Sequence, residues 1–279
     1  MLDDRELDKI RGLLQDPKAP APEKAIPVPG AQPKGRVGKY SILKMLGPST
    51  WMCTDGQRPH ALVMRVLGVT RDPAVVQALC DDLKGIVALK HPVIVTYHKL
   101  SQVDANYFVV RDYVEGRPVS ERGLEPAQAL QIFYEVARAI EYAHERGAAH
   151  GSLGPSNVIV DPTGRPFVVD VGSMTLRQRL RPADATVVAA ASPERDVAAM
   201  GALFTVLMAG GTGVVRPVCP ESDVDISALG RRLAPAPKQP FASVKEIADE
   251  TARILTEMPA QYSTKVGLME KFQRSKDAE

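Results

Sequence analysis

The chain has 279 residues, of which 44% are hydrophobic and 24% are charged, and its formal net charge is +2. The length predicts about two domains or lobes, and the composition is typical of a globular protein with a buried core. The 35 basic residues barely exceed the 33 acidic ones. This balance argues against a dedicated nucleic-acid binder and against attraction to anionic lipid.

The cysteine pattern and the first residues predict a cytoplasmic protein. Cys53, Cys80 and Cys219 are widely spaced and form no Cys-x-x-Cys pair, as is usual in a reducing compartment. The first ten residues are highly charged and lack the basic-then-apolar order of a signal peptide.

Residues 197–215 carry no charge, and a run of this length could span a bilayer. However, the run contains Gly201, Gly210, Gly211 and Gly213, and no aromatic residues flank it. A buried helix followed by a loop explains the run better, and we expect no insertion into a membrane.

The N-terminal segment predicts a helix followed by a linker. In residues 1–16, apolar residues recur at helical spacing between charges. Residues 17–36 then contain six prolines and almost no large apolar residue, which is typical of an extended linker. The helix is either a frayed terminus or a docking helix, for a partner or for the body of the protein.

From residue 40 the pattern becomes that of a folded body. Strand-like runs alternate with turn residues, and Asp72-Pro73 opens a helix as N-cap and first helical residue. In chain order we expect strands at 40–46 and 60–67, a helix from 73 to about 90, strands at 93–97 and 107–110, a helix at 124–146, a hairpin of 158–160 with 167–169, and mostly helix thereafter.

Two segments resemble motifs of eukaryotic-type protein kinases, especially the bacterial Ser/Thr branch. His150-Gly-Ser-Leu-Gly-Pro-Ser-Asn157 is similar to the catalytic loop H-R-D-L-K-P-x-N, and Val168-Val-Asp-Val-Gly172 is similar to the D-F-G motif. Leu89–Val95, Asp112–Gly116 and Asp196–Gly201 match further family segments in the right order.

This resemblance covers roughly residues 38–257 and implies an α+β, bilobal protein-kinase-like fold. Residues 38–115 would form a small antiparallel-sheet N-lobe with one helix, and residues 116–260 a mainly helical C-lobe. Residues 1–37 would be the helix plus linker, and residues 261–279 a helical tail.

The residues that would carry chemistry depart from the family pattern. Ser152 replaces the catalytic aspartate, and loss of such a proton acceptor costs about 10²–10⁴ in rate. Gly154 replaces the loop lysine, and Gly151 replaces an arginine that reads a phosphorylated activation loop. Of the glycine-rich loop only Gly47 remains, followed by Pro48, which has no N–H to donate. We expect a simple hairpin turn there.

The lysine of the third family strand is also missing. Its place falls on Arg65, or on Val63 in the alternative register, and the carboxylate that normally pairs with it falls on Asp82. One hypothesis is a bidentate Arg65–Asp82 ion pair that pins the helix. The alternative is two ordinary surface charges.

Arg111 occupies the position that, in the family, guards the back of the adenine pocket. A guanidinium pointing inward there needs a carboxylate partner, and Asp82 and Asp170 are the candidates. Arg111 would then help to fill the nucleotide site. If the match to the family strand is shifted by one residue, Arg111 would instead point into solvent.

Four other positions resemble retained family residues. Asn157 and Asp170 resemble metal ligands and could hold Mg²⁺ with nucleotide phosphates, or they could cap local turns. His150 and Asp196 resemble residues that brace the kinase core.

These features predict a pseudokinase that acts as a scaffold or allosteric protein-interaction module. We expect no cofactor, other proteins as partners through residues 1–16 and about 262–275, and no nucleic acid. The alternatives keep ATP and Mg²⁺, either for unconventional phosphoryl or nucleotidyl transfer or for nucleotide sensing without turnover.

Overall fold

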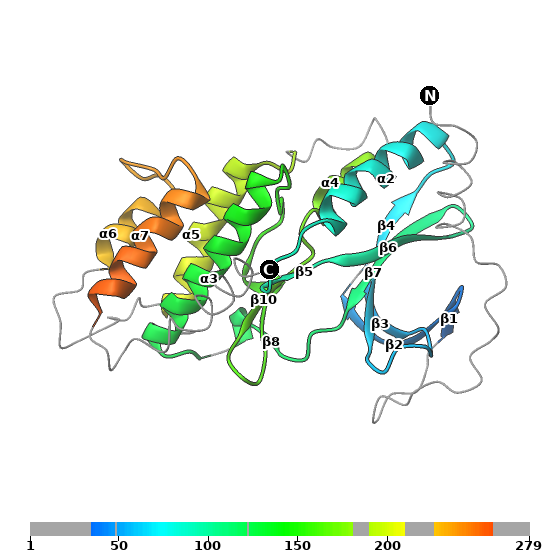
Figure 1. Ribbon diagram of the computed structural model, residues 1–279, viewed down its shortest axis with the longest axis horizontal. Helices are drawn as coiled ribbons and strands as arrows, with labels where there is room; N and C mark the ends of the chain where they lie inside the picture. The colour runs from blue at the N-terminus through cyan, green and yellow to red at the C-terminus, as the bar shows by residue number, and fades with distance from the viewer. Residues whose placement is uncertain (1–34, 48, 122, 181–189, 210–225, 259–279) are drawn as a thin grey trace, which may run out of the picture. The chain divides into compact units, whose positions relative to one another are not determined.

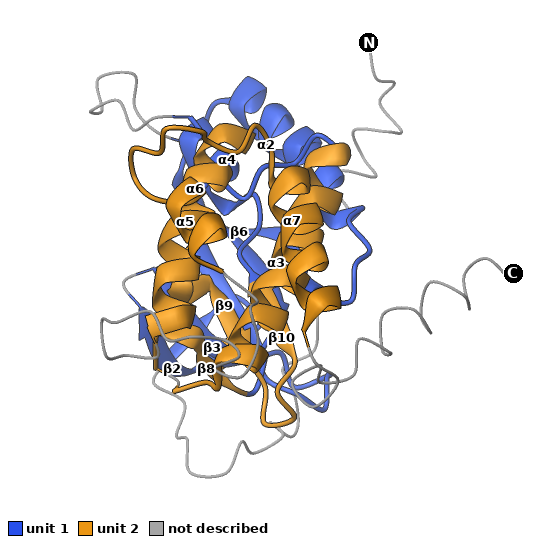
Figure 2. Cartoon of the chain, turned by 90° about the vertical axis from the view of Figure 1, so that its left-hand side faces the viewer, with its two compact units in different colours: residues 1–115, 146–152, 169–191 blue, residues 116–145, 153–168, 192–279 orange. Residues whose placement is uncertain are grey.

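The computed structural model describes residues 35–47, 49–121, 123–180, 190–209 and 226–258. These residues form two compact units, which Figure 2 shows in different colours. Unit 1 contains the described residues up to Glu115 together with Arg146–Ser152 and Val169–Ala191, and unit 2 contains the rest. The predicted N-terminal helix, its linker, the part of the uncharged run beyond Ala209 and the C-terminal tail lie outside the described residues.

Unit 1 is built on a six-stranded antiparallel sheet with the strand order β1-β2-β3-β4-β7-β6 (Figure 1). The sheet curls, so that its two edges approach each other: a Cβ atom on Gly38 would lie 3.3 Å from Val103. The strands of unit 1 are β1 (Gly35–Val37), β2 (Tyr40–Gly47), β3 (Thr50–Thr54), β4 (Leu62–Val69), the short β5 (Ile94–Val95), β6 (Tyr97–Val103) and β7 (Asn106–Asp112).

The central strands β4 and β7 are largely buried on both faces, because apolar residues occupy consecutive positions along them and successive side chains point to opposite faces. Leu62 and Met64 of β4 point into the curl, where they pack with Phe108 and Val110 of β7. Leu67 and the other face of β7 pack against helix α2 (Pro73–Val87) through its buried residues Leu79, Leu83 and Ile86. This alternation determines which polar side chains of β4 and β7 face the helix.

Helix α2 begins as predicted. The side chain of Asp72 accepts a hydrogen bond from the N–H of Ala74 at 2.8 Å, and Pro73 is the first helical residue. The helix ends at Val87, slightly before the predicted end at Lys90.

A second helix of unit 1, α4 (Ser173–Arg179), packs against α2. Leu176 and Leu180 belong to the same apolar cluster as Leu79 and Leu83. The segment that follows Asp170 is therefore part of the core of unit 1.

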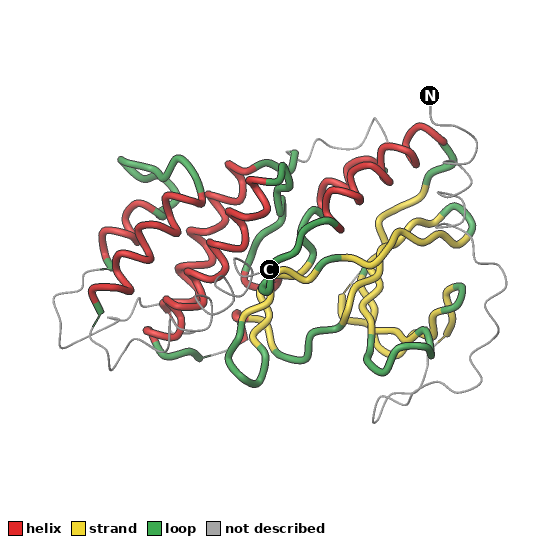
Figure 3. Tube along the Cα trace, in the orientation of Figure 1, coloured by secondary structure: helices red, strands yellow, loops and turns green. Residues whose placement is uncertain are grey.

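Unit 2 contains the predicted hairpin and most of the helices. Strands β9 (Val158–Val160) and β10 (Pro166–Val169) pair with Ile159 opposite Phe167, which confirms the hairpin. The carboxylate of Asp161 closes the turn by accepting from the N–H groups of Thr163 and Arg165. The remaining elements are β8 (Arg117–Pro118), α3 (Pro126–Glu145), α5 (Pro193–Ala209), α6 (Ser227–Arg232), α7 (Val244–Glu257) and the short 3₁₀ helices η1 (Val119–Glu121) and η2 (Pro155–Asn157) (Figure 3).

Helix α5 explains the described part of the uncharged run. It packs against α3, α6 and α7, and its buried residues include Met200, Leu203 and Leu207. However, Ala198, Ala202 and Thr205 are exposed, so the prediction of a fully buried helix is wrong for this side. Gly201 lies so close to the backbone of Leu233 that it has no room for a side chain. Within the described residues, no helix combines the length and apolarity needed to cross a membrane.

We expect Leu176→Ala to destabilise the chain by about 2–5 kcal/mol, because Leu176 is fully buried between α4 and α2 and its truncation leaves a cavity. Urea unfolding followed by circular dichroism measures the change. Leu46→Ala is the matched control, because Leu46 is exposed. Equal free energies of unfolding for the two variants would contradict the placement of α4 in the core.

Candidate functional site

Three side chains of unit 1 meet around the carboxylate of Asp170. On β7, Arg111 shares the helix-facing side with Tyr107 and Val109 and lies opposite Tyr97 of β6. On β4, Arg65 lies on the side opposite to Leu62 and Met64. Because side chains alternate along a strand, three distant sequence positions are brought to one side of the sheet.

Asp170 follows directly on β10 and has a left-handed backbone conformation with φ of +65°, which is uncommon for a residue with a side chain. Its side chain is only 4% exposed. The Nη1 of Arg65 donates to Oδ2 at 2.6 Å. The Nε of Arg111 donates to Oδ1 at 3.0 Å, and the hydroxyl of Tyr97 donates to the same oxygen at 3.3 Å. Both carboxylate oxygens are therefore engaged by the chain itself.

The charges of this cluster determine its protonation. Burial alone would raise the pKa of Asp170, but the guanidinium groups of Arg111 and Arg65 outweigh burial and lower the pKa below its usual value. Burial raises the pKa of Tyr97 well above its ordinary value, and the neighbouring carboxylate of Asp170 adds to this effect. The cluster thus contains an anionic Asp170 and a neutral Tyr97 that donates a hydrogen bond.

Arg111 points inward, as predicted for the inward register. Its side chain is 8% exposed, and its Nη1 also donates to the backbone carbonyl of Asp112 at 3.1 Å. The predicted pairing of Arg111 with Asp170 is confirmed, and the alternative pairing of Arg111 with Asp82 is wrong. A buried guanidinium with two acceptors satisfies the requirement that buried charges be paired.

The predicted Arg65–Asp82 ion pair is wrong. Arg65 binds Asp170, while Asp82 accepts from the Nε and Nη2 of Arg179 at 2.6 and 3.2 Å. The reason is the placement of α4, which brings Arg179 to α2 from 97 positions along the chain. The alternative of two ordinary surface charges is wrong for Arg65, which pairs with the buried Asp170, whereas Asp82 belongs to a partly exposed ion pair. Val63, which the alternative register places at the position of the family lysine, is a buried apolar residue of the same strand.

The segment that resembles the catalytic loop is divided between the units. In unit 1, His150 is fully buried, and its Nδ1 accepts from the N–H of Ser152 at 3.4 Å. Gly151 has φ of +76°, and a side chain there would collide with Ala191 and Met174. The local backbone therefore has no room for the arginine of the family motif.

In unit 2, the N–H of Asn157 donates to the carbonyl of Gly154 at 2.9 Å within η2. Asn157 and Asp170 belong to different units. That they bind one metal ion together therefore stays a prediction. Asp196 is fully buried at the start of α5, and its Oδ2 lies within hydrogen-bond distance of the Nε2 of His144, at 2.9 Å.

The predicted hairpin turn after Gly47 is confirmed, because Gly47 pairs with Thr50 at the end of the β2–β3 hairpin. Pro48 lies outside the described residues.

The residues around Asp170 do not fit a magnesium ion. Mg²⁺ binds through carboxylate oxygens and keeps near-octahedral geometry, but both oxygens of Asp170 already accept from guanidinium groups. A divalent cation at this position would also meet the positive charges of Arg65 and Arg111. Across the described ranges, no group of three or more His, Cys, Asp or Glu side chains is arranged to hold a metal ion.

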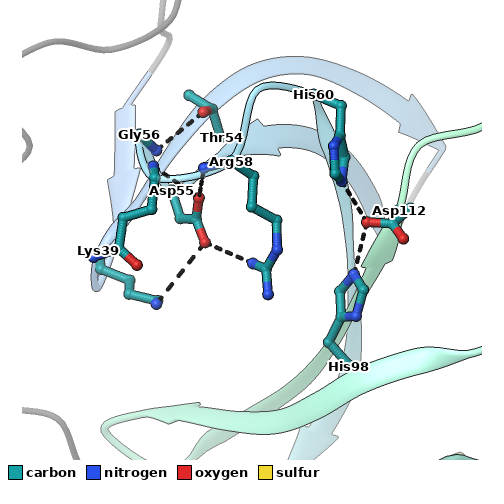
Figure 4. A network of polar contacts seen from close by, with 9 residues as sticks. Lys39, Thr54, Asp55, Gly56, Arg58, His60, His98 and Asp112 are labelled. Atoms are coloured by element: carbon teal, nitrogen blue, oxygen red, sulfur yellow. Dashed lines mark hydrogen bonds and ion pairs between the residues drawn. The ribbon is translucent and has the colours of Figure 1, made fainter.

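A second polar network lies at the end of the same sheet (Figure 4). The Oδ1 of Asp112 is 2.7 Å from the Nε2 of both His60 and His98. Burial would raise the pKa of Asp112, but the hydrogen bonds from the two imidazoles outweigh burial and lower it. The network ties the segments before β4, in β6 and in β7 together where the chain leaves the sheet. No sequence motif predicted it.

The fold and the order of these segments define a protein kinase domain. The family model described as "Protein kinase domain" matches residues 53–194, and the chain belongs to this family.

Among its relatives, the chain is 27% identical over 149 residues to serine/threonine-protein kinase PrkC of Bacillus subtilis, a match that covers 50% of this chain and 23% of that protein. It is 23% identical over 163 residues to CBL-interacting serine/threonine-protein kinase 3 of Arabidopsis thaliana, a match that covers 54% of this chain and 36% of that protein. The chain thus spans well under half of the length of these curated relatives.

The fold resembles that of the PknI kinase domain of Mycobacterium tuberculosis. A crystal structure of a point mutant of that domain matches with a TM-score of 0.55 and 23% sequence identity, covering 77% of this chain and 95% of that one. The bilobal α+β kinase fold predicted from the sequence is confirmed.

We expect Asp170→Asn to lower the free energy of unfolding by about 3–5 kcal/mol at pH 7, because the buried guanidinium of Arg111 and the partly buried one of Arg65 lose their counter-charge. Since the pKa of Asp170 is lowered in the folded chain, this stabilisation is present above the ordinary aspartate pKa of about 3.9 and is lost as the pH falls through the lower folded value. Urea unfolding of both proteins between pH 7 and pH 3 measures the difference. Asp104→Asn is the control, because Asp104 also has a positive φ but is exposed. If the difference in free energy of unfolding between wild type and Asp170→Asn does not shrink toward low pH, Asp170 does not act as a charged partner of the two arginines.

A double-mutant cycle tests the corrected ion pair. Asp82→Ala and Arg179→Ala should show a coupling of about 0.2–1 kcal/mol, the usual range for partly exposed pairs, toward the upper end because the pair is bidentate. The cycle of Asp82→Ala with Arg65→Ala should be additive within about 0.5 kcal/mol. Coupling in the second cycle alone would restore the Arg65–Asp82 pair.

Proposed function

We propose that this protein kinase domain is a pseudokinase, a catalytically inactive module that works through protein contacts. The observation that carries the proposal is the pairing of both oxygens of Asp170, which occupies the D-F-G position, with the guanidinium groups of Arg65 and Arg111. A carboxylate whose charge is already balanced by two guanidinium groups is a poor ligand for a metal ion, which would meet their positive charges.

The chemistry of phosphoryl transfer supports the same proposal. The reaction needs positioned phosphates, metal ions and a carboxylate that orients the attacking hydroxyl. Ser152 stands at the position of that carboxylate, and a serine hydroxyl is a far weaker proton acceptor. Arg65 stands where the family has lysine, and its guanidinium is committed to Asp170.

The contact of Arg111 with the carbonyl of Asp112 is a further argument. In the family, Arg111 corresponds to the residue that guards the back of the adenine pocket. A buried guanidinium occupies volume there and also engages a backbone acceptor at the start of the hinge segment. Both effects disfavour an adenine ring.

The proposed role is that of a scaffold or allosteric partner in bacterial signalling or assembly, in the cytoplasm and without a cofactor. Its contact segments would be residues 1–16 and about 262–275, and its partners other proteins rather than nucleic acid. A tethered helix benefits from a high effective concentration near the surface that it serves. The curated relatives carry the names of kinases, and the proposed inactivity of this chain rests on the residues in which it differs from the family motif.

Thermal unfolding with and without ATP and Mg²⁺ tests the proposal, because a ligand of the native state raises the midpoint. We expect no change in the midpoint for the wild-type chain at millimolar nucleotide, and no transfer of label from α- or γ-labelled ATP. A raised midpoint without label transfer would favour a nucleotide sensor. Label transfer that is lost in Ser152→Ala or Asp170→Asn would show an unconventional transferase. Either result would overturn the proposal.

A further inference from the structure

The cluster around Asp170 carries more positive than negative charge. Two guanidinium groups share one carboxylate, and His150 also contributes electrostatically to holding Asp170 in its charged form. The arrangement differs from that of a metal site, where several anionic or neutral oxygen ligands surround one cation.

The two arginines are held in different ways. Arg111 lies on β7 between two paired strands, opposite Val63 of β4 and Tyr97 of β6. Its side chain is almost fully buried, and separate nitrogen atoms donate to Asp170 and to the carbonyl of Asp112. The side chain therefore cannot leave without abandoning two acceptors in the interior.

Arg65 is less constrained. Its side chain is 18% exposed, and its contact with the hydroxyl of Thr50 is long, at 3.4 Å. Within the described ranges its buried Nε has no hydrogen-bond partner. Arg65 can thus turn toward solvent at a smaller cost than Arg111.

We propose that the Arg111 guanidinium is a built-in replacement for a divalent cation at Asp170, and that Arg111 rather than Arg65 makes this pocket reject metal ions. The inference rests on the proposed function and deepens it by naming the residue that closes the site. Replacing Arg111 with a neutral side chain removes one buried positive charge and leaves Oδ1 of Asp170 with the hydrogen bond from the Tyr97 hydroxyl. Cations that prefer oxygen ligands, such as Mn²⁺ and Mg²⁺, then have a ligand and less repulsion.

Mn²⁺ titration of the purified full-length chain tests this inference, with free Mn²⁺ read from its electron paramagnetic resonance signal. Arg111→Met should bind Mn²⁺ about tenfold more tightly than the wild type, or more, which corresponds to at least about 1.4 kcal/mol. The gain should vanish in Arg111→Met combined with Asp170→Asn. Arg65→Met is the matched control. It removes the donor to Oδ2 but keeps the buried positive charge of Arg111 beside the carboxylate, and it should therefore resemble the wild type.

A second neutral variant guards against a folding defect. Arg111→Gln keeps a side-chain donor that can reach the carbonyl of Asp112, and circular dichroism with gel filtration identifies which variant is folded. A folded neutral variant without Asp170-dependent Mn²⁺ binding overturns the inference. An equal gain in Arg65→Met overturns the assignment to Arg111. If the wild-type chain itself binds Mn²⁺ through Asp170, Arg111 does not exclude metal ions, and the inference is wrong whatever the variants show.

The outcomes also separate this inference from the proposed function. Binding of Mn²⁺ and ATP to the wild-type chain contradicts the pseudokinase proposal itself. A wild type that binds neither, together with a folded Arg111→Met that also binds none, contradicts only the role assigned to Arg111.

Discussion

The buried carboxylate of Asp170 needs a counter-charge, and the chain supplies it from two strands of its own sheet. Burial of an unpaired carboxylate is costly, so Arg111 and Arg65 are as much a requirement of the fold as a feature of the site. Their contacts connect β4, β7 and the segment after β10 within one unit. The same pairing engages both oxygens of the carboxylate at the D-F-G position. Structural stability and the proposed loss of chemistry therefore have one physical origin.

Much of the fold was predictable from the sequence because its signals are local. Strand-like runs between turn residues predicted several of the strands, Asp72-Pro73 marked the start of α2, and the turn residues 161–164 indicated the hairpin. The sequence left open whether Arg111 points inward, but it predicted that an inward guanidinium needs a carboxylate partner and named Asp170 as one candidate. These inferences depend on neighbours along the chain or on a single strand's pattern.

The errors arose where contacts join distant positions. Asp82 pairs with Arg179, and no periodicity or motif links two residues so far apart. The error at Arg65 has the same origin: the family pattern suggested a helix carboxylate, whereas side-chain alternation on β4 points Arg65 toward the end of β10. His60, His98 and Asp112 were missed because three single polar residues on different elements give no spacing signal.

The division of unit 1 among three stretches of chain affects how the protein is made. Leu176 and Leu180 complete a core whose other members are all synthesised well before them. In a ribosome-bound fragment ending near Glu115, α2 can already pack on the sheet, but the part of the cluster that Leu176 and Leu180 cover stays exposed until α4 emerges. Contacts of such long sequence separation slow folding, and exposed apolar surface favours aggregation in the interval. Unit 1 therefore matures only after the first helix of unit 2, α3, has already been translated.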